Sequence, residues 1–148
     1  MSLKYKLNFL LCLLIIANLT ACTRSCQKNE IAERVFFVEP ANNSIHKSQA
    51  PIKIIFGLEG KTLKPAGEDV LEQTSGHHHI LLNNSLGHIP AGHVVPSHAN
   101  NIHFGKAEAE TELRLKPGKH KLSLQFADGA HLSYGKSMAE SIEIVVIE

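Results

Sequence analysis

The sequence contains no tryptophan and only three cysteines, all within its first 26 residues. The part of the chain after Cys26 therefore has neither a disulfide bond nor a thiolate that could bind a metal ion. The chain also lacks an excess of charge of either sign, because 15 basic and 14 acidic side chains leave a formal net charge of +1. This balance argues against a nucleic-acid-binding protein, which normally carries a strongly basic face.

A long hydrophobic run is missing as well. The apolar stretch Phe9–Ala17 is nine residues long and follows the basic residues Lys4 and Lys6. It is too short to span a bilayer, and a basic region followed by a short apolar run is typical of a secretory signal peptide. The sequence therefore predicts a signal peptide over residues 1–21.

Residues 19–22 at the predicted cleavage site, Leu-Thr-Ala-Cys, resemble the lipobox at which bacterial lipoproteins are cleaved and acylated on the new terminal cysteine. Several acyl chains on Cys22 would anchor the protein stably, where a single chain gives only marginal binding. Thr23, rather than an aspartate, follows the cysteine, which predicts a lipoprotein of the outer membrane that faces the periplasm. Residues 22–33 are then a polar tether. The alternative is an ordinary signal peptide that ends in a cysteine.

From residue 34 to residue 148 short segments alternate between apolar and polar residues. In Pro51–Glu59 the even-numbered residues are apolar, as expected of a strand with one buried face. Strands are also predicted at Arg34–Val38, His77–Asn83, Leu113–Leu115, Leu122–Phe126 and Ile142–Val146. Turn residues separate these segments, and no window shows a capped helical pattern. We therefore expect an all-β domain, an immunoglobulin-like antiparallel β-sandwich of about seven strands, with a small closed barrel as the alternative.

One histidine is predicted to have a structural role. The run Leu115–Leu122 resembles the turn into strand F of many such sandwiches, where a tyrosine commonly bonds back to the backbone. His120 occupies the place of that tyrosine. It shares the parity of Leu122 and Leu124, so its side chain should point inward.

Histidine is otherwise abundant, with ten residues, all of them after residue 45. Neutral imidazole is the commonest protein ligand of transition metals such as zinc and copper(II). Three histidines in a row, His77 to His79, open a predicted strand. The parity of Ile80 places His78 toward the core, whereas His77 and His79 should share the outer face, about 6.7 Å apart along the chain.

The sandwich topology would bring two further histidines to this pair. Antiparallel strands alternate in direction, so every second connection lies at the same end of the fold. His103 is predicted in the connection before one strand and His131 after another, so both should meet His77 and His79 at that end. Four imidazoles suit Zn(II) or Cu(II). Cu(I) fits less well, because the mature chain offers only Met138 and one thiol outside the signal and lipidated residues.

Two residues are predicted to support the ligand rings, His78 and Asp128. Asp128 shares strand parity with Phe126 and precedes His131 by three residues, so it could orient a ligand imidazole. Equally, it could cap the turn through its own backbone. For other acidic residues near the site we expect a solvated surface position: Glu68, Asp69, Glu108 and Glu110.

Three more histidines, His88, His93 and His98, continue with His103 at a spacing of five. The stretches 87–90 and 92–96 look like a small duplication, Gly-His-Ile-Pro and Gly-His-Val-Val-Pro. A spacing of five matches neither the strand nor the helix period. We therefore interpret these residues as part of a polar loop, with a loose metal-capturing tract as the alternative.

Several short motifs resemble, in order, those of a known family. They are Phe56-Gly57, Pro65 to Gly67, Gly76 to His79, His103 to Lys106, Thr111, Pro117 to His120, and Asp128 with His131. Over roughly residues 34–148 the chain is similar to an uncharacterised bacterial envelope family, domain of unknown function 4399. The resemblance implies an envelope location and no established activity. Ala107 and Glu108 stand where Gly-Gln is usual, and the histidines of the 88–98 loop lie outside the family pattern.

Three functions follow from these features. The favoured one is a noncatalytic envelope lipoprotein that binds Cu(II) or Zn(II) through the four histidines. The second is a metal-free interaction or scaffolding module. The third is a metalloenzyme similar to copper-zinc superoxide dismutase, which the missing disulfide and zinc loop disfavour. No catalytic residue is predicted, because the sequence has no His-Glu-x-x-His, phosphate-binding glycine loop or Gly-x-Ser-x-Gly.

Overall fold

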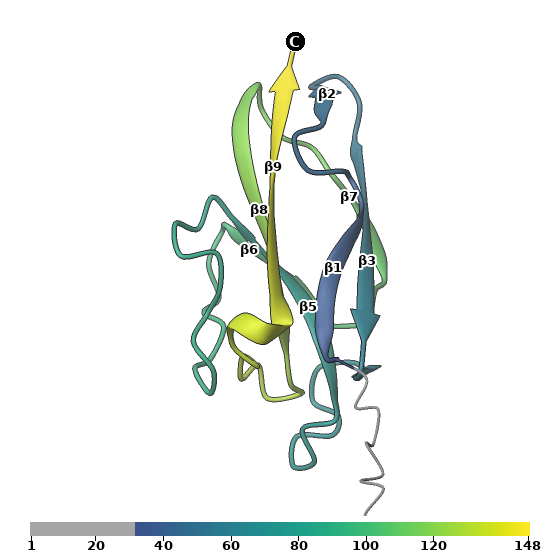
Figure 1. Cartoon of the computed structure of the whole chain (residues 1–148), viewed down its shortest axis with the longest axis vertical. Coiled ribbons are helices and arrows are strands. Elements are labelled where there is room, and N and C mark those ends of the chain that lie inside the picture. The colour runs from purple at the N-terminus through teal and green to yellow at the C-terminus, as the bar shows by residue number, and fades with distance from the viewer. Residues whose placement is uncertain (1–31) are drawn as a thin grey trace, which may run out of the picture. The chain divides into compact units, whose positions relative to one another are not determined.

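The computed structural model describes residues 32–148, in which nine strands form two sheets (Figure 1). The smaller sheet has the order β1-β3-β7, with β1 at Arg34–Glu39, β3 at Ile52–Glu59 and β7 at Glu110–Leu113. The larger sheet has the order β2-β9-β8-β5-β4, and β6 pairs with β5. Its strands are β2 (Ile45–Lys47), β4 (Thr62–Leu63), β5 (Ser75–Leu82), β6 (Asn101–Phe104), β8 (Gly118–Ala127) and β9 (Ala139–Ile147). A short 3₁₀ helix, η2 (Lys136–Met138), precedes β9.

The predicted signal peptide, the lipidated Cys22 and nearly all of the tether lie outside the described residues. Among residues 32–148 no helix has the length and apolar character that a membrane span requires.

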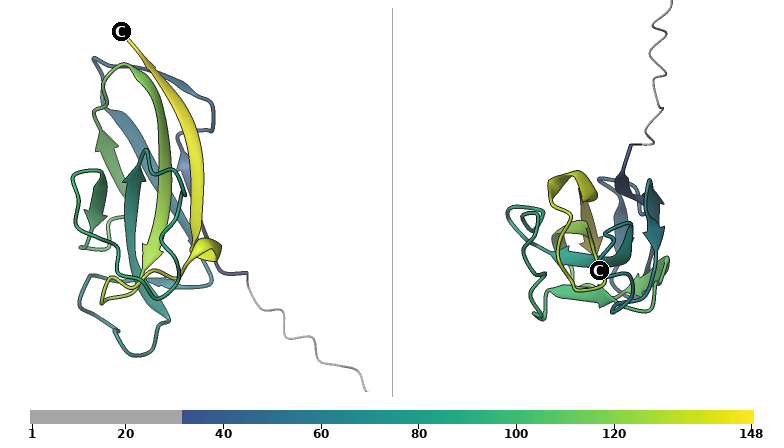
Figure 2. Two further views of the ribbon diagram at one scale, coloured as in Figure 1. Left: turned by 90° about the vertical axis from the view of Figure 1, so that its left-hand side faces the viewer. Right: turned by 90° about the horizontal axis from the view of Figure 1, so that it is seen from below.

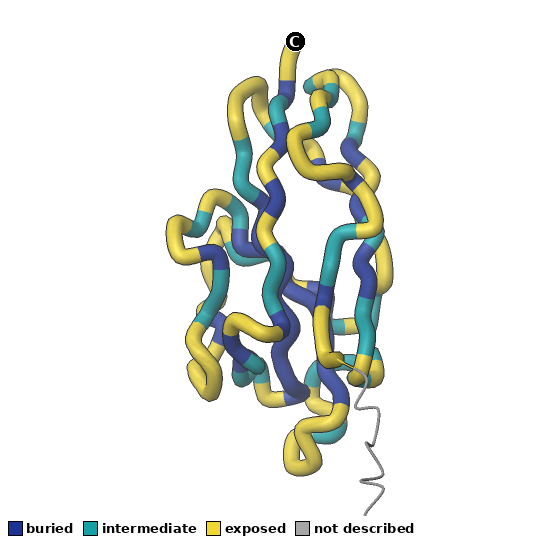
Figure 3. The backbone as a smooth tube through the Cα atoms, in the orientation of Figure 1, coloured by how far each residue is buried: buried dark blue, intermediate teal, exposed yellow. Residues whose placement is uncertain are grey.

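The two sheets face each other and enclose the hydrophobic core (Figure 2). Alternate residues of a strand point to the same side, and each long strand buries an apolar face. Figure 3 shows this alternation of buried and exposed residues along β9. The core residues of the long strands are Ile52, Ile54, Phe56, Ile80, Leu122, Leu124, Phe126, Ile142, Ile144 and Val146. The sequence pattern predicted these inward positions.

The all-β sandwich is thus confirmed, with nine strands in place of about seven. The additional strands β2, β4 and β6 have only two to four residues, too few to produce a recognisable alternation. Two pairings, β2 with β9 and β4 with β5, are parallel, so the sandwich is not purely antiparallel. The strand expected at Leu113–Leu115 lies earlier, since β7 ends at Leu113 and Leu115 is half-buried beyond it.

The long segment between β5 and β6 folds back over the larger sheet. It forms a hydrogen-bonded ladder with the turn after β8: the amides of Gly92 and Val95 donate to the carbonyls of Ser133 and His131, each at 2.9 Å. The Ile89 amide donates to the side-chain oxygen of Gln125 at 2.9 Å, which attaches the segment to β8. All of β5 except half-buried Leu82 is consequently buried, including the face that points away from the sandwich core.

Candidate metal centre

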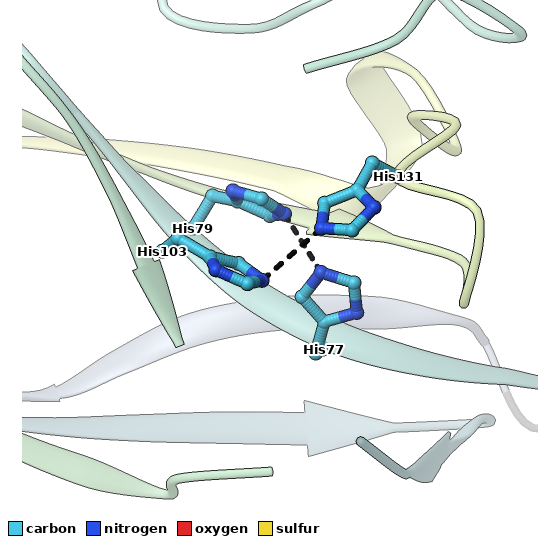
Figure 4. Close-up of side chains that lie close together, drawn as sticks. All are labelled: His77, His79, His103 and His131. Carbon is cyan, nitrogen blue, oxygen red and sulfur yellow. Dashed lines mark hydrogen bonds between the residues drawn. The ribbon is translucent and has the colours of Figure 1, made fainter. Parts of the chain in front are cut away.

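Four histidine rings converge next to β5 (Figure 4). His77 and His79 stand two residues apart on β5 and therefore point to the same face of the strand. His103 lies on β6, where it is the direct cross-strand partner of His79. His131 lies in the turn that follows β8 and reaches the rings from the other side of β5, since β5 pairs with both β6 and β8.

The rings present nitrogen atoms to one another. The Nε2 atoms of His77 and His79 are 3.0 Å apart, and those of His103 and His131 are 3.2 Å apart. Taking one ligand nitrogen from each ring, all four lie within 4.8 Å of one another. A tetrahedral zinc ion with Zn–N bonds of about 2.0–2.1 Å sets its ligand nitrogens about 3.3–3.4 Å apart. The two close pairs, at 3.0 and 3.2 Å, need to separate by about 0.1–0.4 Å to reach that spacing, and the wider pairs need to approach by about 1.5 Å at most.

The cluster is buried on one side and open on the other. His77 and His79 have exposed fractions of 0% and 3%. His131 is half-buried and His103 is exposed. An ion held here would therefore be coordinated by two ligands from the interior of the domain and two from its surface.

Burial keeps the inner rings neutral. Burial, followed by repulsion from His131 and His103, lowers the pKa of His77 to about 4. Burial, followed by repulsion from the neighbouring histidines, lowers the pKa of His79 to about 2. The pKa of His103 is lowered for the same reasons. Neutral imidazole is the form that binds metals, so these rings are in the metal-binding protonation state at neutral pH.

A glycine makes room for the His103 ring. A Cβ added to Gly105 would come within 2.3 Å of Cε1 and 2.5 Å of Nε2 of His103. The ring therefore lies directly against the backbone of Gly105, two residues further along the chain. The sequence analysis did not single out this glycine for that role, and the only signal for it was its place in the His-Phe-Gly-Lys motif.

Asp128 acts on His131 through the backbone. One carboxylate oxygen, Oδ1, accepts hydrogen bonds from the amides of Ala130 at 2.9 Å and Leu132 at 2.8 Å, and the His131 amide donates to the Asp128 carbonyl at 2.9 Å. The turn holds His131 at a φ of 66°, a conformation that is uncommon for residues other than glycine. Two roles were considered for Asp128, orienting a ligand imidazole and capping the turn. The hydrogen bonds of its carboxylate are those of a turn cap. Within residues 32–148 no hydrogen bond joins its carboxylate to an imidazole.

Glu108 is a second negative charge near the rings. Its carboxylate accepts a hydrogen bond from the Lys106 amide at 2.8 Å. Its charge acts to raise the pKa of both His77 and His103, against the larger effect of burial. The sequence analysis expected only a solvated surface residue here, because β6 and the Lys106 turn that bring Glu108 close were not predicted.

His78 lies on the opposite face of β5, in the hydrophobic core. Its ring packs against Phe56 at a centroid distance of 4.9 Å and against Phe126 at 5.1 Å. Its Nδ1 is buried without a hydrogen-bond partner in the described part of the chain. Burial, followed by repulsion from His77, lowers its pKa to about 4. His78 therefore supports β5 by packing, and no hydrogen bond connects it with the four rings.

The remaining histidines lie apart from the cluster. Nε2 of His120 is 2.8 Å from the Lys116 carbonyl and donates to it, a bond back to the backbone four residues upstream. In the loop, Nδ1 of His88 and of His93 each lies 3.3 Å from the carbonyl two residues earlier. The preceding glycines, Gly87 and Gly92, have φ values of 78° and 75°. The duplication seen in the sequence is thus also a duplication of local structure. Nδ1 of the His98 ring accepts a hydrogen bond from the Asn100 amide at 3.1 Å.

Fold and site together define a class of protein, an all-β sandwich that gathers four histidines beside a central strand. The chain belongs to the family described as Domain of unknown function (DUF4399), whose sequence model matches residues 54–147. This confirms the family resemblance and includes all four histidines, while β1 and β2 precede the matched range. No curated protein and no solved structure matches the chain.

Proposed function

We propose that this protein is a noncatalytic lipoprotein of the bacterial cell envelope that binds one Cu(II) or Zn(II) ion through His77, His79, His103 and His131. The observation that carries the proposal is the convergence of four imidazole nitrogens within 4.8 Å from three separate segments of the chain. Buried imidazoles are normally satisfied by carbonyls or carboxylates. These four rings face one another instead.

A cation would use this arrangement better than hydrogen bonds between the rings do. A contact between two neutral imidazoles uses one proton and one lone pair, so in the two contacts of the cluster two of the four facing nitrogens donate and only two present a lone pair. A metal ion would accept a lone pair from all four facing nitrogens, with each ring proton on the nitrogen that faces away. The carboxylates of Asp128 and Glu108, which act to raise the pKa of His77, also favour positive charge at this place.

The donor set selects the kind of metal. Four imidazoles are typical ligands of Zn(II) and Cu(II), whereas Cu(I) prefers sulfur and Mg²⁺ or Ca²⁺ prefer oxygen. Residues 32–148 contain no cysteine, and Met138 is fully buried in the hydrophobic core. Four protein ligands are the mark of a zinc site that binds rather than catalyses, which supports the noncatalytic part of the proposal.

The proposed location rests on the N-terminal sequence. Lipidation of Cys22 would hold the domain at the periplasmic face of the outer membrane, with residues 23–33 as a tether. The anchor is then the contact with the membrane, and the four-histidine site faces the periplasm.

The test is metal binding by the purified protein without a histidine tag. After dialysis against Zn(II) or Cu(II), elemental analysis should find about one equivalent per chain. The double variant His77→Ala/His79→Ala should lose it, and the double variant His93→Ala/His98→Ala, which removes two exposed loop imidazoles, should retain it. Equal metal content in both variants would refute the site. A melting curve insensitive to chelators, together with a captured envelope protein, would favour the metal-free interaction module.

A further inference from the structure

A small pocket adjoins the open side of the four-histidine cluster. It has a volume of about 200 Å³ and is lined by His79, His103 and His131 together with loop and strand residues. The other lining residues are Val95, Pro96, Ser97 and Asn101. His77 is absent from the lining, so the pocket approaches the cluster from the side opposite its most buried ring.

The walls of this pocket are fixed to the elements that hold the ligand rings. The Val95 amide donates to the His131 carbonyl at 2.9 Å, which ties the loop wall to the His131 turn. On the other side, the Asn101 side-chain amide donates to the Pro96 carbonyl at 2.9 Å, which ties the loop to the first residue of β6. The pocket is therefore built into the fold, and its position relative to His103 and His131 is defined by hydrogen bonds.

Size and charge restrict what this pocket can accept. Sites for drug-sized ligands usually have volumes of roughly 300–1,000 Å³, so a pocket of about 200 Å³ suits a molecule of a few heavy atoms. Its lining contains no lysine or arginine. A metal ion with four neutral imidazole ligands keeps its charge of +2, so the metal would supply the positive charge that the pocket walls lack.

We infer that this pocket gives a small anion access to the bound metal, where the anion takes a further coordination position beside the four imidazoles. The inference rests on the proposed metal site and adds to it the class of ligand that the site takes. Cu(II) is the ion for which it applies most directly, because tetragonal copper adds an axial ligand to four nitrogen donors. The Ser97 hydroxyl and the second N–H of the Asn101 amide are the polar groups at the pocket wall that can donate to such an anion.

The experiment uses azide as the probe on protein loaded with one equivalent of Cu(II). The His93→Ala/His98→Ala background keeps copper off the exposed loop imidazoles. Azide coordination to copper produces a charge-transfer absorption band that can be titrated, and the same titration of metal-free protein should give no band. Ser97→Trp fills the pocket and should weaken azide binding at least tenfold while copper content stays the same. Ser97→Leu should give an intermediate effect. The matched control is Ser85→Trp, an exposed serine of the same loop that does not line this pocket.

The outcomes separate this inference from the proposed function. Failure to bind copper at all contradicts the metal site itself. Copper binding with no azide band in the parent protein leaves the metal site standing and overturns the inference. An azide affinity that is the same in Ser97→Trp and Ser85→Trp also overturns it, because azide would then reach the metal by another path. A loss of azide affinity that is confined to the Ser97 variants supports the inference.

Discussion

His79 and His103 are direct cross-strand partners in the β5–β6 ladder, and their rings stack at a centroid distance of 5.0 Å and an interplanar angle of 29°. The position of one ligand relative to the other is therefore set by strand register. A slip of one residue would turn either side chain to the opposite face of the sheet. The cluster thus depends on the short strand β6 being paired correctly with β5.

Metal binding should stabilise the fold, because the cluster joins β5, β6 and the turn after β8. A ligand that binds only the folded state adds about 2.7 kcal/mol at a free concentration of 100 times its Kd. For a domain of this size the melting temperature should rise by on the order of 10 °C. Differential scanning calorimetry with and without Zn(II), followed by chelator, measures the shift. His79→Gln should abolish it, and a shift of equal size in that variant would contradict binding at the cluster.

Gly105→Ala should weaken metal binding without unfolding the protein. The added Cβ would lie within 2.5 Å of His103 Nε2, so the ring must move away from its present position. We expect the metal affinity, measured by competition with a chromogenic chelator, to fall at least tenfold. Gly92→Ala is the converse control, because no atom lies within 4 Å of its added Cβ but its φ of 75° disfavours alanine. It should lower the free energy of unfolding by about 1–2 kcal/mol and leave the metal affinity unchanged. A loss of metal affinity in Gly92→Ala but not in Gly105→Ala would contradict this account.

The alternation of side chains carried most of the information about the fold. It located the long strands and the faces that they bury, and the parity of Ile80 correctly separated His78 from His77 and His79. Together with the sandwich topology, it also singled out the four histidines that the structure brings together. The short strands β2, β4 and β6 escaped it, so His103 was expected in a connection although it lies on β6.

The burial of the cluster could not be read from the sequence. The outer face of β5 was expected to be exposed, but the loop over residues 83–100 covers it. Several of the hydrogen bonds that hold that loop are main-chain bonds, such as those from the Gly92 and Val95 amides, which leave no side-chain signature. The sequence left the role of Asp128 undecided for a similar reason, because both hydrogen-bond partners of its carboxylate are backbone amides.

Cys22 and Cys26 provide a matched pair of variants for the proposed lipid anchor. If Cys22 is acylated, Cys22→Ala should move the protein from the membrane fraction to the soluble periplasmic fraction and remove labelling by radioactive palmitate. Cys26→Ala should change neither result, because the lipobox pattern ends at Cys22. Immunoblots of fractionated cells make the comparison. Membrane association that survives Cys22→Ala would support the ordinary signal peptide instead.

His78→Leu should separate the core histidine from the cluster. The ring of His78 packs between Phe56 and Phe126 and has a buried nitrogen without a partner in the described residues. Leucine has a similar volume and no polar group to desolvate, so we expect the free energy of unfolding to rise by about 1–2 kcal/mol. The metal affinity should remain within about twofold of the parent value, because His78 faces away from the ligands. A large loss of affinity would show that His78 positions the cluster directly.

The metal-free protein should lose stability as the pH falls below about 6.5. Burial lowers the pKa of His77 and His78 to about 4 and that of His79 to about 2, whereas unfolded histidine has a pKa of about 6.5. Between these values the unfolded chain binds more protons than the folded one, so acid favours unfolding. Each such proton changes the free energy of unfolding by up to about 1.4 kcal/mol per pH unit. Urea titrations at pH 7.5, 6.0 and 5.0 should show a steady decrease in the free energy of unfolding. In His78→Leu this decrease should be smaller, because one fewer proton is taken up on unfolding. A stability that stays constant over this range would mean that these rings are not buried in neutral form.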